Sequence, residues 1–331
     1  MIDNIRTIAV VGSGYMGGGI AQSLAIVGFP VVIADVSVQY AEAARARLID
    51  EADRFEASGV FPVGAADAVR KNLTVARDIE TAVAHVDFVQ EAVSEVVAIK
   101  HEVLARISAA ASPEAIIGSN TSTIPVSELD VAVVGPERFL NVHWSNPAPF
   151  VPGVELIVGR KTDRATLPIV KRMLTRAGRS GAEVADVPGF VLNRLQYVLL
   201  KEAASIVEEG VASIQDVDTI VRTTFGFRLA FFGPFAIADM AGLDVYANGF
   251  HTFEEGFGPR LAAPQLLLDQ VAAGRHGVKN GGGWTGDVDA DRLRALEDYR
   301  ARAYSALVRL RADLGPSPLE ADAVAPAATE S

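Results

Sequence analysis

His143 is the histidine whose place in the sequence best suits chemistry. It ends an apolar run, residues 139–143, which is predicted as a strand and is followed by Trp144-Ser145-Asn146-Pro147. Polar residues at the carboxyl ends of strands in an open parallel sheet lie where ligands bind, and an imidazole titrates in the range needed to take a proton from an alcohol. On this pattern alone, a structural histidine is the more frequent outcome.

Glu155 is the expected partner of His143. It lies in the apolar segment 151–158, where an unpaired carboxylate would be costly to bury. A carboxylate that hydrogen-bonds an imidazole fixes its tautomer and its orientation. The two residues together predict a general base for the proton of a substrate hydroxyl.

Five small polar residues, Ser119-Asn120-Thr121-Ser122-Thr123, follow a predicted strand at residues 116–118. Their hydroxyl and amide groups could hydrogen-bond a substrate hydroxyl. Pro125 and Glu128 instead favour a helix cap, which is the better interpretation on spacing alone.

A glycine-rich turn lies between a predicted strand at residues 7–11 and a predicted helix at residues 20–26. Its sequence, Gly12-Ser13-Gly14-Tyr15-Met16-Gly17, fits the pattern G-x-G-x-x-G. The glycines allow a tight turn, a close approach of backbone to a pyrophosphate, and close packing of helix on strand. Asp35 ends the next predicted strand, where a carboxylate would bind a ribose 2′-hydroxyl. Because this carboxylate would repel a 2′-phosphate, and the next residues, Val36 and Ser37, offer no arginine to receive one, NAD is predicted rather than NADP.

The elements that must position these residues alternate between strand and helix. A second strand is expected at residues 30–34 and a long helical region at residues 38 to about 70, followed by strands at 73–75, 88–90, 116–118 and 139–143. This alternation predicts an α/β fold, a Rossmann-type doubly wound sheet that is mostly parallel.

The residue pattern of the sequence changes after Pro188. Helical periodicity with few strand signals predicts an all-α C-terminal domain. We therefore expect an NAD-binding domain at residues 1–187, a helical substrate and dimerisation domain at 188–314, and a disordered tail at 315–331, where prolines and alanines accumulate.

Composition excludes several classes of function. The 331 residues carry 30 Lys and Arg against 41 Asp and Glu, a formal charge of -11, which opposes binding to nucleic acid or to an anionic membrane surface. The absence of cysteine rules out disulfides, thiolate metal sites and cysteine nucleophiles,. Residues 7–34 are uncharged but interrupted by glycines. We expect a cytoplasmic protein with no metal site, no nucleic-acid partner and no membrane partner.

Several separate motifs, in the same order along the chain, resemble the L-3-hydroxyacyl-CoA dehydrogenase superfamily over residues 5 to about 286. Besides the glycine-rich turn, the run 119–122 and the run 143–147, they are Glu91-Ala92-Val93-Ser94-Glu95, Pro188-Gly189-Phe190-Val191-Leu192-Asn193-Arg194, Gly233-Pro234-Phe235 with Asp239, Gly242-Leu243-Asp244, and Gly277-Val278-Lys279-Asn280-Gly281.

The resemblance implies a role for each matching residue. His143 would be the general base and Glu155 its orienting partner, while Ser122 and Asn193 would bind the substrate oxygen and Asn146 would support the substrate loop. Glu95 and Lys100 would contact the nicotinamide half of NAD, and Asn120 would also belong to the cofactor site. Without the family, Lys100 reads as a surface lysine and Asn193 as a helix cap. The resemblance further implies a homodimer formed through the helical domain.

The chain departs from the CoA-using members of this superfamily in the region that follows Asp35. Those members carry a lysine-rich helical hairpin there, whereas residues 36–69 contain no lysine and only three arginines. Val96 stands where the family has asparagine. The sequence is more similar to the branch acting on free hydroxy acids or hydroxymethyl and aldehyde carboxylates, such as the gulonate, carnitine and pyridoxine-breakdown dehydrogenases.

Arg228 is the candidate for binding a substrate carboxylate. It lies in the aromatic segment 225–234, and arginine can bind a carboxylate through two parallel hydrogen bonds; an exposed cation at a helix end fits the pattern equally. The leading hypothesis is an NAD-dependent dehydrogenase of a small carboxylate-bearing 3-hydroxy acid or related alcohol or aldehyde. The alternatives are a 3-hydroxyacyl-CoA dehydrogenase and a non-catalytic, crystallin-like NAD-binding protein.

Overall fold

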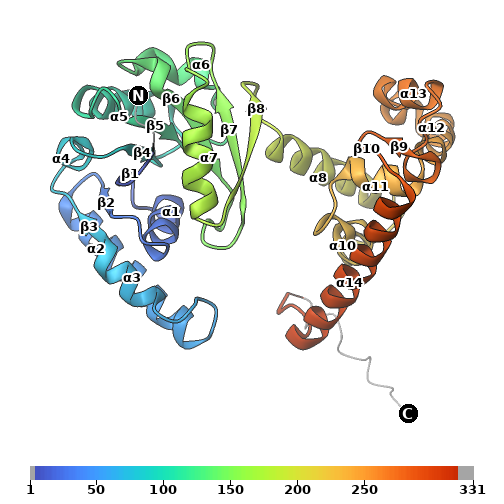
Figure 1. Cartoon of the computed structure of the whole chain (residues 1–331), viewed down its shortest axis with the longest axis horizontal. Coiled ribbons are helices and arrows are strands. Elements are labelled where there is room, and N and C mark those ends of the chain that lie inside the picture. The colour runs from blue at the N-terminus through green and yellow to red at the C-terminus, as the bar shows by residue number, and fades with distance from the viewer. Residues whose placement is uncertain (1–3, 320–331) are drawn as a thin grey trace. The chain divides into compact units, whose positions relative to one another are not determined.

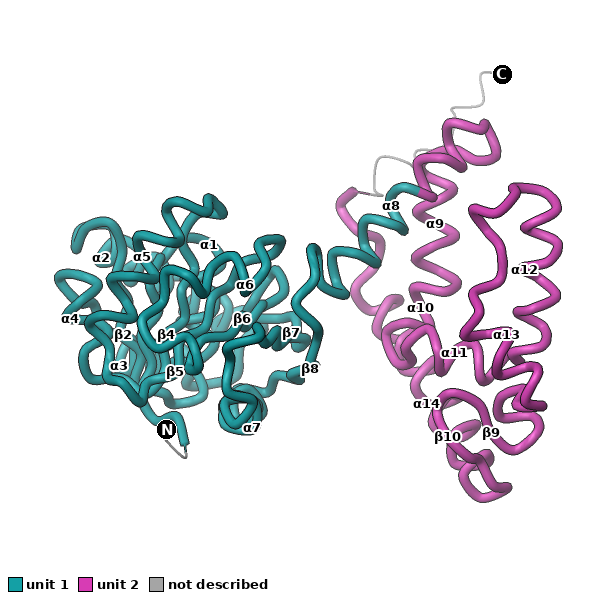
Figure 2. The backbone as a smooth tube through the Cα atoms, turned by 90° about the horizontal axis from the view of Figure 1, so that it is seen from above, with its two compact units in different colours: residues 1–201 teal, residues 202–331 magenta. Residues whose placement is uncertain are grey.

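The computed structural model describes residues 4–319, in which two compact units divide between Lys201 and Glu202 (Figures 1 and 2). Unit 1 is built on a large sheet and unit 2 is almost entirely helical. The division falls within helix α8 (Leu192–Glu208), later than the expected boundary between residues 187 and 188, which stays a prediction. Of the expected disordered tail, residues 320–331 lie outside the described residues.

An eight-stranded sheet forms the centre of unit 1. Its strand order is β3-β2-β1-β4-β5-β6-β7-β8, and every neighbouring pair is parallel except β6 and β7. This order, with helices between the strands, confirms the predicted α/β fold. The strands are β1 (Ile8–Val11), β2 (Val31–Ala34), β3 (Leu73–Val75), β4 (Phe88–Glu91), β5 (Ile116–Ser119), β6 (Phe139–Trp144), β7 (Gly153–Val158) and β8 (Ser180–Ala185).

The central strands are apolar on both faces because both faces of the sheet are covered. In β1, Ile8 and Val10 belong to one hydrophobic cluster, and Ala9 and Val11 to the other, as the two-residue period of a strand requires. Helices α1 (Tyr15–Ile26), α2 (Val38–Ala57), α3 (Ala65–Asn72) and α7 (Thr166–Arg176) contribute to the first cluster, and α4 (Ile79–Val83), α5 (Val97–Ala110) and α6 (Val126–Leu129) to the second.

Two elements of unit 1 differ from expectation. The helical region expected at residues 38 to about 70 is two helices, α2 and α3, because Pro62 and a left-handed Gly64 (φ +89°) interrupt it. Strand β8 was not predicted, since its side chains are largely exposed and provide no apolar signal. The apolar segment containing Glu155 is strand β7.

Unit 2 has a small hydrophobic core. Its cluster of buried residues contains Ala238, Leu243 and Leu267. Tyr304 packs near the rings of Phe227 and Phe231 in the aromatic segment. The elements are the end of α8, α9 (Ile214–Thr223), α10 (Phe225–Leu229), α11 (Pro234–Ala241), α12 (Leu243–Phe257), α13 (Gln265–Ala272), the short pair β9 (Gly282–Gly283) and β10 (Gly286–Asp287), and α14 (Ala290–Leu314).

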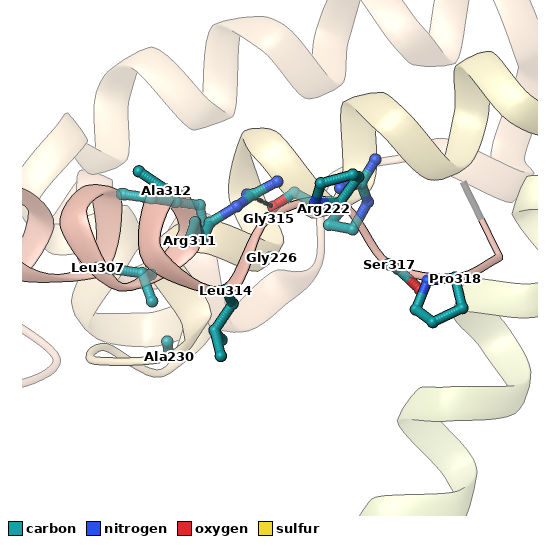
Figure 3. A pocket seen from close by; sticks show the side chains of 12 residues that line it. Arg222, Gly226, Ala230, Leu307, Arg311, Ala312, Leu314, Gly315, Ser317 and Pro318 are labelled. Atoms are coloured by element: carbon teal, nitrogen blue, oxygen red, sulfur yellow. Dashed lines mark hydrogen bonds between the residues drawn. The ribbon is translucent and has the colours of Figure 1, made fainter. Parts of the chain in front are cut away.

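A shallow cavity of about 810 Å³ lies within unit 2, between α9, α10 and α14 (Figure 3). Arg222 and Arg311 line it together with apolar side chains such as Leu307, and Arg311 Nη1 donates a hydrogen bond of 3.1 Å to the Arg222 carbonyl. None of the residues expected in the active site lines this cavity.

Within residues 4–319, no single helix has the length and apolar composition needed to cross a membrane. One sharply bent pair, Ile214–Leu229 with Pro234–Ala241, meets those criteria of length and composition together.

Candidate active site

Strands β6 and β7 bring His143 and Glu155 together. The strands pair antiparallel with these two residues directly opposite each other, so their side chains lie on the same face of the sheet. His143 Nδ1 lies 2.8 Å from Glu155 Oε2, and both residues are buried. An ionised carboxylate can only accept a hydrogen bond, so Nδ1 carries the hydrogen, which assigns the tautomer with a lone pair on Nε2. Nε2 makes no hydrogen bond with any residue between 4 and 319, so it can accept a proton.

The second oxygen of Glu155 holds the start of α8. Oε1 accepts hydrogen bonds of 2.9 Å from the backbone N–H groups of both Val191 and Leu192. Burial acts to raise the pKa of Glu155, but the bonds from His143, Leu192 and Val191 outweigh it and keep this pKa below its ordinary value,. Glu155 therefore stays ionised beside the imidazole.

Phe190 completes the surroundings of His143. Its ring centroid lies 5.8 Å from that of the imidazole, and the residue is 1% exposed with a φ of +49°. A positive φ is uncommon for an aromatic residue, so the buried ring and the Glu155 bonds to the two following residues hold this turn. The motif containing Phe190 was noted in the sequence, but no role was predicted for this residue.

Ser122 lies in a turn that other segments hold in place. Glu95 Oε1 accepts hydrogen bonds from the Thr121 hydroxyl (2.6 Å), Ser122 N–H (2.7 Å) and Thr123 N–H (3.1 Å). Asn193 Nδ2, in the first turn of α8, donates to the Ser122 carbonyl at 3.0 Å. The Ser122 hydroxyl makes no hydrogen bond with the described residues, which leaves it available to a ligand.

The helix-cap interpretation of residues 119–123 is wrong. Helix α6 begins after Pro125, which has no capping side chain. Its first N–H groups, at Val126 and Ser127, donate instead to the carboxylate of Asp186 at 2.7 and 3.0 Å. The small polar residues at 119–123 therefore do not cap helix α6.

Lys100 is buried, so its interpretation as a surface lysine is wrong. The residue is 1% exposed, and its Nζ lies 2.8 Å from Glu91 Oε1, 3.2 Å from the Val93 carbonyl and 3.4 Å from Glu95 Oε2. Burial acts to raise the pKa of Glu95, but hydrogen bonds from Thr121 and Ser122 and the charge of Lys100 lower it overall. Glu91 is the last residue of β4, and no role was predicted for it from the sequence. Its position at the end of an apolar strand, like that of Asp35, was the signal that could have marked it as a residue of the site.

The glycine-rich turn is shaped to admit a phosphate group. Gly12 has a φ of +94°, and a Cβ on Gly17 would lie 1.8 Å from the Gly12 carbonyl oxygen. A Cβ on Gly14 would meet no atom within 4 Å, and Gly14 begins α1 with no side chain capping that helix. The first N–H groups of α1, from Tyr15 onward, therefore adjoin open space, as at anion sites on helix N-termini.

Asp35 lies beside this turn, at the end of β2. Its Oδ2 accepts hydrogen bonds from Ser13 N–H (2.6 Å) and the Ser13 hydroxyl (2.5 Å), and its Oδ1 accepts from Val36 N–H. A carboxylate has about four lone-pair directions, so it can also receive a ribose hydroxyl. The turn and Asp35 therefore fit NAD. Met16 and Gly17, which were also predicted to bind the cofactor, lie in the first turn of α1.

The remaining predicted residues are placed as follows. Asn120 Oδ1 accepts a hydrogen bond of 2.8 Å from Trp144 N–H and so ties the ends of β5 and β6 together. Asn146 is exposed in the loop after β6. Arg228 is half-buried on α10 of unit 2, so it is not among the residues that unit 1 brings together. Among residues 4–319, no group of three or more His, Asp or Glu side chains is arranged to hold a metal ion.

Two family models together match most of the chain. The model of the 3-hydroxyacyl-CoA dehydrogenase NAD-binding domain matches residues 7–187, and the model of the C-terminal domain matches residues 189–286. A 5-formyl-3-hydroxy-2-methylpyridine 4-carboxylate 5-dehydrogenase from Mesorhizobium japonicum is 36% identical, covering 92% of this chain and 98% of that protein. An L-carnitine dehydrogenase from Pseudomonas putida is 34% identical, with 90% and 92% covered.

Solved structures extend the same likeness. A crystal structure of an NAD⁺-dependent 5-formyl-3-hydroxy-2-methylpyridine 4-carboxylic acid 5-dehydrogenase matches with a TM-score of 0.69 and 35% identity, covering 92% of this chain and 98% of that one. A 3-hydroxyacyl-CoA dehydrogenase from Archaeoglobus fulgidus matches with a TM-score of 0.77 and 30% identity over the same shares of the two chains. The chain therefore belongs to the 3-hydroxyacyl-CoA dehydrogenase family, as an NAD-dependent dehydrogenase acting on a CH–OH group.

Proposed function

We propose that this protein transfers a hydride between NAD and a small carboxylate-bearing 3-hydroxy acid, or a related alcohol or aldehyde. The observation that carries the proposal is the buried His143–Glu155 pair, whose 2.8 Å contact leaves Nε2 of the imidazole without a partner among the described residues. A base held in this way suits the removal of a hydroxyl proton near neutral pH.

Each residue of the site has a distinct task in oxidation. His143 Nε2 takes the hydroxyl proton, and the ionised Glu155 stabilises the imidazolium that results. The Ser122 hydroxyl hydrogen-bonds the substrate oxygen, and Asn193 holds the Ser122 backbone through the 3.0 Å bond to its carbonyl. The Gly12–Gly17 turn and Asp35 would hold NAD, which would supply the hydride acceptor when bound. In the reverse direction, His143 returns its proton to the carbonyl oxygen.

The charges of α2 favour a free acid over a CoA thioester. Arg47 pairs with Glu51 at 3.0 Å and Arg54 with Asp50 at 3.4 Å. Arg45 donates to the carbonyls of Leu73 and Arg70. Arg47 and Arg54 are therefore paired with acidic residues and Arg45 donates to two carbonyls, so none of the three is left unpartnered for the phosphates of CoA. Arg228 remains our candidate for the substrate carboxylate.

A homodimer formed through the helical domain is part of the proposal. Helix α8 has no buried residue in the described structure, although it carries Leu195, Val198 and Leu200, each more than half exposed. Apolar surface of this extent is typical of an interface. Sedimentation velocity tests the proposal: a monomer at micromolar concentration would contradict it.

The test of the proposed activity is a screen of NADH formation and consumption. Its panel contains free 3-hydroxy acids, aromatic aldehydes that carry a carboxylate, and acyl-CoA thioesters with their hydroxyacyl forms. We expect turnover with members of the first two groups and its loss in His143→Ala with NADH binding retained. Efficient turnover restricted to the CoA thioesters would support the 3-hydroxyacyl-CoA alternative. Absence of turnover with the whole panel would support the non-catalytic alternative.

A further inference from the structure

We propose that Asp186 is a positioning residue of the active site, which sets the place of Ser122 relative to His143. Its carboxylate binds the start of α6 and so links the chain that follows Ser122 to the chain that leads into α8. The inference deepens the proposed function and rests on it, because it concerns the residues assigned to the substrate hydroxyl.

Asp186 joins two segments that lie about 60 residues apart in the chain. It directly follows β8, and its Oδ1 accepts from Val126 N–H at 2.7 Å while its Oδ2 accepts from Ser127 N–H at 3.0 Å. Each oxygen has its own donor, and the charge of the carboxylate strengthens both bonds. Because Pro125 provides no side-chain cap at this helix end, Asp186 supplies from another segment what a local residue usually supplies.

The chain between Ser122 and Val126 has little freedom to absorb a displacement. Ile124 N–H donates to the Thr121 hydroxyl at 3.1 Å, and the ring of Pro125 fixes its φ, which is -57°,. Ile124 and Val126 are both buried. A shift of the start of α6 is therefore passed on to Ser122.

The segment that follows Asp186 is bound to the catalytic pair. Glu155 Oε1 accepts from two N–H groups at the start of α8, both at 2.9 Å, and Asn193 Nδ2 donates to the Ser122 carbonyl at 3.0 Å. Between Asp186 and these contacts, the ring of Phe190 is buried and its φ is +49°. This segment is therefore anchored along its length.

The Ser122 turn and the α8 segment meet at two points. Asn193 binds the turn at Ser122 itself, and Asp186 binds the chain beyond it. Glu95 also binds this turn, but from the loop between β4 and α5, and so sets its place relative to that loop. Relative to the α8 segment, one contact would leave the turn free to pivot. Two contacts fix the direction of the Ser122 hydroxyl as well as the place of its backbone.

Asp186→Asn removes one of the two acceptors with the smallest change of shape. An amide has one carbonyl oxygen, so one N–H of α6 keeps its bond and the other faces an NH₂ group. The start of α6 then moves and carries Ser122 with it. A displacement of about 1 Å in a group that positions the reaction can cost about 100-fold in rate.

The experiment compares Asp186→Asn with Glu56→Gln, a matched control. The two carboxylate oxygens of Glu56 also bind N–H groups at the start of another helix, those of the capping residue and the second residue of α3, at 2.9 and 2.8 Å. The measurements are kcat and KM with the best substrate of the panel, NADH affinity by fluorescence and the thermal unfolding midpoint. Crystal structures of the wild type and of both variants give the place of Ser122 relative to His143.

We expect D186N to lower kcat by about 10- to 100-fold and to move the Ser122 hydroxyl by about 0.5 Å or more relative to the His143 imidazole. NADH affinity should stay within about threefold, because Asp186 binds α6 rather than the cofactor turn. E56Q should also lower the unfolding midpoint, since it loses the same kind of bond, while its kcat stays within about twofold of the wild type.

A double variant with Ser122→Ala tests whether Asp186 acts through Ser122. Once the hydroxyl is gone its direction no longer matters, so adding D186N to S122A should lower kcat by no more than about threefold. If D186N does not fold, Asp186→Glu takes its place. It keeps both acceptors and the charge but lengthens the side chain by one methylene, so it should displace α6 and lower kcat by more than about threefold.

Two results would overturn the inference. One is a D186N protein with a lower unfolding midpoint whose kcat and Ser122 position match those of the wild type, as a purely structural cap predicts. The other is a double variant whose loss is the product of the losses of the single variants. If the wild type binds NADH but turns over no substrate, the proposed function fails, while the crystal structures still decide on Asp186.

Discussion

Glu155→Gln tests the central pair with the smallest change of shape. Glu155 accepts three hydrogen bonds, from His143 Nδ1 at 2.8 Å and from Val191 and Leu192 N–H at 2.9 Å. A glutamine can keep the two backbone bonds with its carbonyl oxygen, which leaves its NH₂ group facing Nδ1. Nδ1 must then accept a hydrogen bond, so the imidazole proton moves to Nε2 and blocks the atom that acts as the base.

The magnitude follows from losing the base in the correct tautomer. General base catalysis contributes about 100- to 10,000-fold, so kcat should fall by that factor, or about 3–5 kcal/mol in activation free energy. NADH affinity should stay within about threefold, because the Gly12–Gly17 turn does not contact Glu155 and a catalytic loss of this kind need not change binding.

The assay is steady-state NADH oxidation, with NADH affinity measured on the same preparation. Glu183→Gln is the control, because Glu183 is an exposed carboxylate of the neighbouring strand β8, paired with Arg164; it should keep wild-type kcat. A kcat for Glu155→Gln within about tenfold of the wild type, with folding and NADH binding intact, would refute the assignment of Glu155 as the residue that sets the tautomer.

Three further predictions concern the cofactor turn and pH. Gly17→Ala should abolish measurable NADH binding, because its Cβ would lie 1.8 Å from the Gly12 carbonyl oxygen; retained affinity by fluorescence titration would contradict the close approach. Asp35→Ala should weaken NADH binding by about 10- to 100-fold while NADPH loses less, and equal losses would show that Asp35 does not select the cofactor. The folded pKa of Glu155 is lowered, so its stabilisation is complete above its unfolded pKa of about 4.3 and is lost as pH falls through the lower folded value. The difference in unfolding free energy between wild type and Glu155→Gln, measured in urea, should therefore shrink as the pH falls below about 4.3, and a constant difference would argue against an ionised Glu155.

Much of unit 1 could be predicted from local patterns. The strands at residues 73–75, 88–90, 116–118 and 139–143 are all present, within a residue of their predicted ends. Short apolar runs bounded by turn residues encode such strands directly, because each residue's preference depends on its neighbours in the chain. Strand β8 has exposed side chains, so no such signal marks it.

The contacts of the site join residues that are separated in the chain, and local sequence patterns do not encode such contacts. His143 and Glu155 meet because β6 and β7 pair antiparallel in one register, and a shift by one residue would send their side chains to opposite faces. Lys100 reads as a surface lysine in its helix, yet β4 supplies the buried carboxylate that pairs with it.

The sequence by itself determined the α/β fold, the glycine-rich turn with Asp35, and a histidine at the end of a strand. These features are local, since they rest on the two-residue period of strands and on the backbone freedom of glycine. The sequence predicted Glu155 as the partner of His143, but only the tertiary structure provided the register that places the two side chains opposite each other. Only the tertiary structure decided that Glu95 and Asn193 hold the Ser122 turn and that Lys100 is buried. The reason is that each of these depends on strand order and register, which bring together hydrogen-bonding groups from segments far apart in the chain.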